Sequence, residues 1–154
     1  RHKLATSSLE ELANEEFLNV IGDSSIDMAG AKRVVLCSGK VYYHLLEERE
    51  ARGITDVALV RLEQLYPFPD DELEEILKAY SNIKDIVWCQ EEPMNQGAWY
   101  SSQHHMRHVI QRTHPQLHLS YVGRESSAAP AAGYMSVHLE EQKKFIDEAL
   151  SFTS

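Results

Sequence analysis

The feature that most constrains the fold is a regular alternation between short apolar runs and longer amphipathic stretches. Apolar runs of strand length occupy residues 33–39, 56–65, 85–90 and 117–123. Each is followed by a stretch with helical spacing of apolar residues, at 40–53, 67–80, 97–113 and 129–150, the last of which includes a loop. This alternation favours a mostly parallel sheet, because parallel neighbours need a crossover that a helix supplies. We therefore expect a three-layer α/β domain with a mostly parallel sheet, in which an antiparallel strand is allowed at one edge.

Local signals set the limits of this domain. Gly53 is expected to cap the end of the first long helix, and Ser136 the start of the final one. The final helix is expected to turn four apolar residues inward: Val137, Phe145, Ile146 and Leu150. A capping-box pattern at Ser7–Leu12 predicts a short helix in an otherwise irregular region. We assign residues 1–30 to an N-terminal connecting segment and 31–154 to a single α/β domain.

Charge and composition argue against several classes of partner. The 154-residue chain has a formal net charge of −9 and a pI near 5.3, so neither nucleic acid nor an anionic membrane surface is expected as a main partner. No apolar run approaches the roughly 20 residues of a membrane-spanning helix. Cys37 and Cys89 lie in strand-like runs, and we interpret them as buried reduced thiols, with a disulfide or a reactive thiol as alternatives.

Unusual polar residues follow the predicted strands, whose carboxyl ends share the edge where ligands of such sheets bind. Arg61 lies in an otherwise apolar strand and needs a partner, either Glu63 or Glu91 in an ion pair or a bound anion. Lys40 follows Ser38-Gly39 at a helix start whose N–H groups suit an anion, with a plain strand-to-helix turn as the alternative. The hypothesis is an anion or effector site formed by four residues: Lys40, Arg61, Gln90 and Arg124.

The stretch WCQEEPMNQGAW, residues 88–99, places two carboxylates and three amides between two tryptophans. Three interpretations are open, namely an acid/base pair, a ligand contact, or a loop ordered for a partner. Glu91 and Glu92 are adjacent on extended chain and point to opposite sides, so they are poorly placed to share a proton. We favour an interface loop that contacts other domains or a second subunit through five residues: Glu91, Glu92, Asn95, Gln96 and Trp99.

His104 and His108 lie four residues apart on one predicted helix face, a spacing that can hold a metal ion. No Glu follows the first histidine as in H-E-x-x-H, and we assign both a structural role. No Walker, G-x-G-x-x-G or G-x-S-x-G motif occurs. We therefore assign no catalytic residue, no cofactor-binding residue and no metal ligand.

Five segments together resemble one family. They are RHKLATSSLEEL, LCSGKVYYHLLEER, ALVRLEQLYPFP, VWCQEEPMNQGAWY and YVGRESSAAPAAGYMSVHLEEQ. They resemble the C-terminal domain of the thiamine-diphosphate-dependent decarboxylase component of 2-oxoglutarate dehydrogenase, over nearly the whole chain. The resemblance implies a Rossmann-like fold similar to the last domain of transketolase. It also implies a homodimeric enzyme of the tricarboxylic acid cycle, which decarboxylates 2-oxoglutarate and passes the succinyl group to the lipoyl arm of a dihydrolipoyl succinyltransferase core.

The same resemblance implies that upstream domains bind thiamine diphosphate and Mg²⁺, so that this chain alone is expected to be inactive. The domain would serve assembly and dimerisation. It would also serve regulation if it takes up a nucleotide or acyl-CoA effector, as some relatives do. Alternatives are the equivalent domain of a related 2-oxoadipate dehydrogenase and an independent small α/β enzyme. We expect the bacterial cytoplasm rather than the mitochondrial matrix, and we interpret the absence of an initial Met as a sign of a longer chain.

Overall fold

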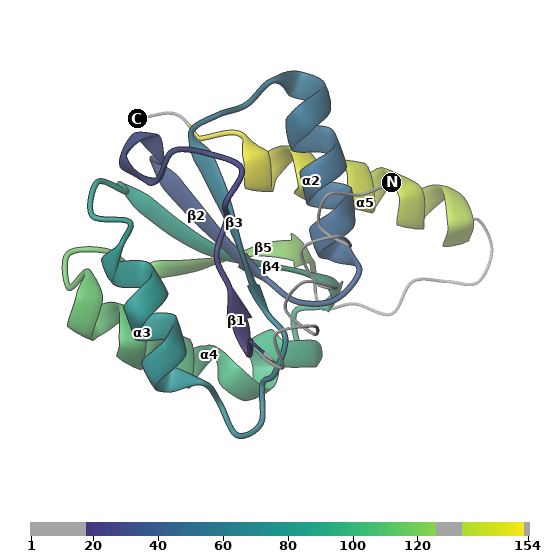
Figure 1. Cartoon of the computed structure of the whole chain (residues 1–154). Coiled ribbons are helices and arrows are strands. Elements are labelled where there is room, and N and C mark those ends of the chain that lie inside the picture. The colour runs from purple at the N-terminus through teal and green to yellow at the C-terminus, as the bar shows by residue number, and fades with distance from the viewer. Residues whose placement is uncertain (1–17, 126–133, 153–154) are drawn as a thin grey trace.

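Within residues 18–125 and 134–152, which the computed structural model describes, five strands form one mixed sheet in the order β1-β3-β2-β4-β5 (Figure 1). The strands are β1 (Val20–Ile21), β2 (Arg33–Cys37), β3 (Val57–Leu62), β4 (Asp85–Pro93) and β5 (Leu119–Arg124). β1 pairs antiparallel with β3, and the other three pairings are parallel. The predicted mostly parallel α/β sheet is confirmed, and its antiparallel strand lies at one edge.

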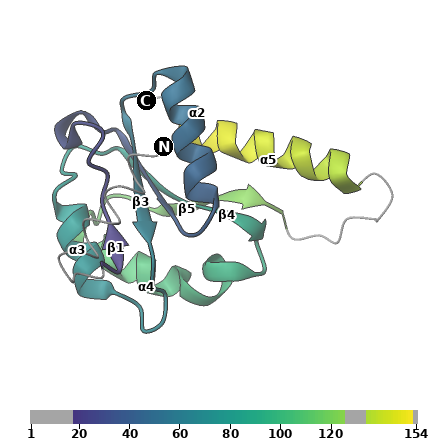
Figure 2. The same cartoon turned by 45° about the vertical axis from the view of Figure 1, so that its right-hand side comes forward.

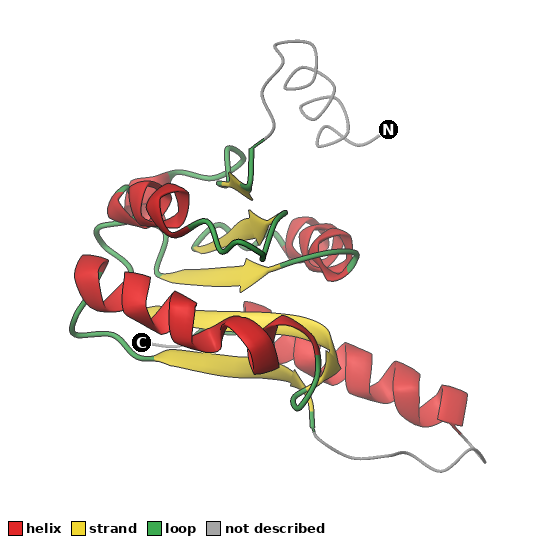
Figure 3. Cartoon of the chain, turned by 90° about the horizontal axis from the view of Figure 1, so that it is seen from below, coloured by secondary structure: helices red, strands yellow, loops and turns green. Residues whose placement is uncertain are grey.

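Helices cover both faces of this sheet (Figure 3). In the described ranges they are η1 (Met28–Gly30), α2 (Val41–Arg52), α3 (Asp70–Lys78), α4 (Gly97–Thr113) and α5 (Tyr134–Leu150). α2 and α5 pack on one face, and α3 and α4 on the other. As predicted, Gly53 ends α2 in the left-handed conformation, with a φ of 67°. None of these helices has the length and apolar character needed to cross a membrane.

Two apolar cores result, because successive residues of a strand point to opposite faces. The core beneath α3 and α4 includes Leu36, Trp88, Leu73 and Met106. The core beneath α2 and α5 includes Val35, Leu59, Leu45 and Phe145. β2 and β3 are covered on both faces, which explains why they read as continuous apolar runs in the sequence.

Three local expectations are corrected by the structure. Residues 18–30 are not merely a connection, since Val20 and Ile21 form the edge strand β1, which is too short for any periodicity to predict. Ser136 lies inside α5 rather than capping it, because the helix already begins at Tyr134. Val137 is exposed, whereas Phe145, Ile146 and Leu150 are buried as predicted. The predicted helix at Ser7–Leu12 lies outside the described residues.

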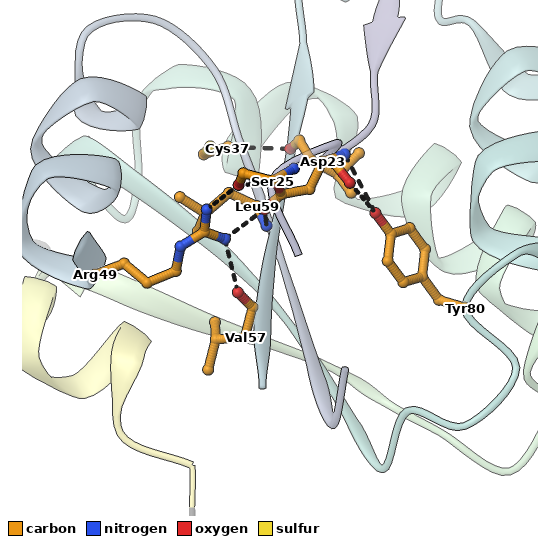
Figure 4. A network of polar contacts seen from close by, with 8 residues as sticks. Asp23, Ser25, Cys37, Arg49, Val57, Leu59 and Tyr80 are labelled. Atoms are coloured by element: carbon orange, nitrogen blue, oxygen red, sulfur yellow. Dashed lines mark hydrogen bonds and ion pairs between the residues drawn. The ribbon is translucent and has the colours of Figure 1, made fainter. Parts of the chain in front are cut away.

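A buried ion pair holds residues 18–25 against the domain (Figure 4). The Asp23 carboxylate accepts hydrogen bonds from Arg49 Nη1 and, at 2.9 Å, from the Leu59 backbone N–H. Arg49 also donates to Ser25 and, at 2.9 Å, to the Val57 carbonyl. Burial alone would raise the pKa of Asp23, but the hydrogen bonds from Arg49, Leu59 and Ser25 outweigh it and lower that pKa. β1 pairs with only two residues of β3. Asp23 and Arg49 provide hydrogen-bond partners for the Leu59 N–H and the Val57 carbonyl, which lie on the part of β3 that β1 does not reach.

Candidate functional site

The chain changes its winding direction between the neighbouring strands β2 and β4. α2 leaves β2 toward one face and α4 leaves β4 toward the other, so the loops after these strands diverge. In open α/β sheets, ligands bind at such a divergence, beyond the carboxyl ends of the strands. The candidate residues from the sequence lie in or beside this edge, which we call the carboxyl edge.

Gln90 organises the loop after β4 from the inside. Its Oε1 accepts hydrogen bonds from Trp88 Nε1 at 2.8 Å and from the Trp99 backbone N–H at 2.9 Å. Its Nε2 donates to the carbonyl oxygens of Glu92 and Gln96, at 3.0 and 2.8 Å. The buried amide thus supplies the cap for the first turn of α4 that the Gln96 side chain does not provide.

Two glycines let the chain close around this amide. Gly97 has a φ of 67°, and a Cβ there would stand 3.2 Å from Gln90 Oε1. A Cβ on Gly123 would lie 2.5 Å from the Tyr121 hydroxyl and 2.7 Å from the Gln90 carbonyl oxygen. The Tyr121 hydroxyl in turn bonds the Glu92 carbonyl at 3.2 Å. A larger residue at Gly123 therefore has to displace neighbouring atoms, and one at Gly97 crowds the Gln90 amide.

Trp99 belongs to the core of this domain. Its side chain is only 8% exposed, and its ring lies 5.3 Å from that of Tyr121 and 5.2 Å from the Arg107 guanidinium carbon. This placement corrects the expectation of an interface anchor, because the first turn of α4 directs Trp99 toward the sheet. Its removal should act on the stability of the domain itself.

The outer side of the same loop faces solvent. Glu92, Asn95 and Gln96 are exposed and Glu91 is half-buried, so these four predicted interface residues remain accessible. Met94, between them, is also exposed. The loop is therefore shaped from within by Gln90 and presents a mixed polar and apolar surface outward.

Arg61 is buried near the end of β3, against the first turn of α2. Its guanidinium carbon lies 4.4 Å from the Tyr42 ring centroid, and Nη1 lies 3.5 Å from the Tyr43 hydroxyl. The predicted pairing with Glu63 is present but long, with 3.8 Å between Nη1 and the carboxylate. Within the described part of the chain, Arg61 Nε is buried without a hydrogen-bond partner. A buried N–H in this state leaves capacity for one further acceptor.

The four residues of the predicted anion site do not converge. Gln90 points toward the α3/α4 layer, where it bonds Trp88, whereas Arg61 and Arg124 point toward the α2/α5 layer. Arg124 moreover donates hydrogen bonds to the Glu91 carbonyl of β4 and to the Glu141 carboxylate of α5. The reason is that successive side chains along a strand point to opposite faces of the sheet, so the place of a residue in its strand decides which helical layer its side chain meets. Only Lys40, exposed at the start of α2, and Arg61 remain on one side near the same helix start.

The two cysteines are free and buried, as the sequence predicted. Cys37 and Cys89 are register partners on β2 and β4. Burial raises the pKa of Cys37 to about 12 and that of Cys89 well above its ordinary value. Thiols held protonated and shielded from solvent are poor nucleophiles.

The histidines on α4 form no metal site. The ring of His104 lies 4.1 Å from that of His105, which stacks on Phe68 at 5.1 Å. Nowhere in 18–125 or 134–152 are three or more His, Cys, Asp or Glu side chains grouped to hold a metal ion.

Exposed apolar side chains gather at the carboxyl edge, a feature that the sequence did not predict. Nine large apolar side chains are exposed among the described residues, and eight lie at or beside this edge; Met28 is the exception. We call these eight the apolar edge residues: Leu18, Tyr43, Tyr66, Met94, Tyr100, Met135, Val137 and Leu139. Tyr66 and Tyr100 are 93% and 71% exposed. Contiguous exposed apolar patches in soluble proteins are typical of contact surfaces.

Fold and site together define the class of protein, a doubly wound Rossmann-like α/β domain with an exposed apolar carboxyl edge. The family model described as 2-oxoglutarate dehydrogenase C-terminal matches residues 6–150. The chain belongs to this family, and the resemblance in the sequence is confirmed.

Relatives support the same assignment. The chain is 56% identical over 152 residues to the 2-oxoglutarate dehydrogenase E1 component of Azotobacter vinelandii, covering 98% of this chain and 16% of that protein. It is 52% identical over 153 residues to the E1 component of Haemophilus influenzae, covering 99% of this chain and 16% of the relative. The corresponding protein of Coxiella burnetii is 46% identical over 153 residues, covering 97% of this chain and 16% of that protein. The chain therefore spans only 16% of the length of these curated relatives.

Proposed function

We propose that this domain serves the assembly of a 2-oxoglutarate dehydrogenase E1 component, and that its carboxyl edge packs against the rest of that protein or a second subunit. One observation carries the proposal, namely the gathering of eight of nine exposed large apolar side chains at this edge. An exposed surface of this kind is costly for a domain that functions alone. The small share of the relatives' length that the chain covers leaves ample protein to occupy the edge.

The full-length protein that we propose is a homodimer in the bacterial cytoplasm, since the matched relatives named above are bacterial. It carries out the thiamine-diphosphate- and Mg²⁺-dependent oxidative decarboxylation of 2-oxoglutarate in the tricarboxylic acid cycle. It passes the succinyl group to the lipoyl arm of the dihydrolipoyl succinyltransferase core. Other domains hold the cofactor and the metal, and the isolated chain has no activity of its own. A 2-oxoadipate dehydrogenase is the alternative for the full-length protein.

The assembly role can be tested with a matched pair of methionines. Met94 lies at the carboxyl edge and Met28 at the opposite edge, with similar exposures of 38% and 44%. We expect Met94→Ser to lower the melting temperature of the full-length enzyme by several degrees, because burying a Met side chain contributes about 1.5–3 kcal/mol. The same change should leave the isolated chain almost unaffected, and Met28→Ser should affect neither.

Calorimetry of the full-length enzyme and of the isolated chain measures both effects. Equal losses from Met94→Ser and Met28→Ser in the full-length enzyme would contradict the assembly role. So would a loss from Met94→Ser that is as large in the isolated chain.

A second role, binding of a nucleotide or acyl-CoA effector, is supported by the buried Arg61 Nε that lacks a partner. We place this site at the start of α2, where Tyr42 stacks on Arg61 and Lys40 adds an exposed positive charge. Gln90 and Arg124 are not part of it.

A thermal-shift series tests the effector role, with AMP, acetyl-CoA and coenzyme A as probes and thiamine diphosphate with Mg²⁺ as the control ligand. A probe at 100 times its Kd should stabilise the chain by roughly 2.7 kcal/mol. We expect Lys40→Ala to weaken the shift and Lys32→Ala, an exposed lysine at the opposite edge, to leave it unchanged. If none of the three probes raises the melting temperature, the effector role is wrong. If thiamine diphosphate raises it, the proposal that other domains hold the cofactor is wrong.

A further inference from the structure

The side chain of Arg124, at the end of β5, joins the final helix to the sheet. Its Nε donates to the Glu91 carbonyl of β4 at 2.9 Å. Its Nη1 donates to the His138 carbonyl at 3.0 Å and to Glu141 Oε1 at 3.1 Å. The backbone carbonyl of Arg124 accepts a hydrogen bond from the Met94 N–H at 3.0 Å. One buried residue thus holds the first half of α5 and the loop after β4 together.

The first two turns of α5, residues 134–141, extend beyond the sheet, and we call them the arm (Figure 2). Met135 and Leu139 of the arm are 64% and 59% exposed. Among residues 135–150 the buried side chains all lie in the second half of the helix: Phe145, Ile146, Ala149 and Leu150. Hydrophobic burial therefore holds the second half of α5, whereas the hydrogen bonds from Arg124 hold the arm.

The exposed apolar residues of the arm continue the buried face of the same helix. At 3.6 residues per turn, successive side chains are about 100° apart, so Met135, Leu139 and Ile146 lie within about 40° of one another. Ile146 is buried against the sheet. One apolar stripe thus runs along α5, and the sheet covers only its second half. The arm directs the uncovered half of this stripe to the side on which the sheet has ended.

We propose that the arm is a pre-organised docking element, and that its face of Met135 and Leu139 packs on another domain of the same E1 subunit. The inference rests on the proposed assembly role and names the occupant of one part of the carboxyl edge. Arg124 holds the arm in place before docking, and this lowers the entropy that association would otherwise cost. Because Arg124 also binds the loop that carries Met94, the arm and that loop meet the occupant as one rigid surface.

The extent of the apolar surface favours a domain of the same subunit over a second subunit. A stable interface between separate proteins uses about 20–30 residues on each side. The arm presents two apolar residues on this face, and all eight apolar edge residues are still far fewer than that. A domain in the same polypeptide needs fewer contacts, because the covalent connection holds it at a high effective concentration. The chain spans 16% of the length of its relatives, so such a protein has ample further domains.

Site-specific photo-cross-linking in the full-length enzyme identifies the occupant. The photoreactive residue p-benzoylphenylalanine replaces Leu139, and peptide mapping after irradiation locates the residues that it has reached. We expect a cross-link to a peptide outside the 154 residues of this chain, in a product that keeps the mass of one subunit on a denaturing gel. The same residue at Lys144 is the matched control, because Lys144 is exposed and lies about 140° around the helix from Leu139. The control should give this product in several-fold lower yield.

Each other result of the cross-linking contradicts the inference. A product with the mass of two subunits would overturn the assignment to the same subunit and would leave the assembly role intact. A cross-link confined to the 154 residues of this chain would show that the chain covers its own arm. Equal yields from positions 139 and 144, or no product at all, would show that the apolar face has no specific occupant. The assembly role is tested separately by the pair Met94→Ser and Met28→Ser, so the two proposals can fail independently.

Hydrogen exchange of the isolated chain tests whether the arm is ordered before docking. We expect amides of residues 134–144 to exchange many-fold more slowly than in an unfolded peptide, and several-fold faster in Arg124→Met than in wild type, with equal rates in 145–150. Arg52→Met is the matched control, because it removes an arginine that binds Asp147, at 2.7 Å, in the second half of α5. It should leave 134–144 unchanged. Exchange of the wild-type arm at the rate of an unfolded peptide would overturn its pre-organisation, as would an equal effect of both arginine variants.

Discussion

Replacement of Asp23 is the sharpest test of what holds the first described segment to the domain. Asp23→Ala removes the carboxylate that binds Arg49 and the Leu59 N–H, while Arg49 stays 2% exposed among its remaining partners. Breaking a buried ion pair from one side costs about 3–5 kcal/mol, because the other charge is left without its counter-ion. A domain of this length loses about 2–4 °C per kcal/mol, so we expect the melting temperature to fall by about 6–20 °C.

Thermal unfolding followed by circular dichroism measures this loss, with an exposed ion pair as the matched control. Glu48 pairs with Arg52 at 2.8 Å, but both side chains are substantially exposed. Glu48→Ala should therefore cost less than about 1 kcal/mol. The double variant Asp23→Ala/Arg49→Met should lose less than the sum of the two single changes, since neither charge is then left alone. A loss from Asp23→Ala no larger than that from Glu48→Ala would refute the reasoning.

The same carboxylate predicts a pH dependence with a definite sign. The pKa of Asp23 in the folded chain is lowered, so the unfolded chain takes up the proton first as the pH falls. The stabilisation is fully present above the ordinary carboxyl pKa of about 4, and it is lost as the pH falls from there toward the folded-state value. The difference in unfolding free energy between wild type and Asp23→Ala should therefore be constant from pH 7 to about pH 5 and then shrink. A difference that stays constant down to about pH 3 would contradict this role of Asp23.

Three other predictions follow from the carboxyl edge and the core. Trp99→Ala should lower the unfolding free energy of the isolated chain by about 3–5 kcal/mol in urea denaturation, whereas Tyr100→Ala, at a 71% exposed neighbour, should stay within about 0.5 kcal/mol; equal effects would contradict the core assignment of Trp99. Gly97→Ala should cost about 1–2 kcal/mol in the same assay, because its φ of 67° is unfavourable for a residue with a Cβ, and an unchanged midpoint would refute that reason. Cys37 and Cys89 should react with an aromatic disulfide reagent only as fast as the chain unfolds, and rapid labelling of the native chain would argue against their burial.

The fold class was accessible from the sequence because its signals are local and repeated. The apolar runs that became β2, β3 and β4 are buried on both faces, and their lack of alternation is itself the signature of a parallel sheet between two helical layers. The predicted helix over 97–113 coincides with α4, since a change from strand to helical periodicity marks its start. Two-residue β1 has no such signal, and only its pairing with β3 makes it a strand.

The candidate site was accessible only in part. Sequence reasoning identified Arg61 as a charge that needs a partner, because a cation in an apolar strand is conspicuous wherever it lies. It could not place Gln90 and Arg124 on opposite faces of the sheet. Which face a strand residue meets depends on the register of strand pairing, and that register shifts in β4 after Gln90. Trp99 and Met94 also looked alike as apolar residues of one loop, but only Trp99 is buried.

The sequence by itself thus determined the family, the layered α/β architecture and the apolar strands, because these depend on residue type and on spacing between neighbours along the chain. The tertiary structure decided which side chains meet across distant segments. It brought Asp23 to Arg49 and Arg124 to His138, and it gathered Tyr66, which is 93% exposed, with the other apolar residues at one edge. Exposure and pairing are properties of packed surfaces, and a packed surface exists only after the chain has folded.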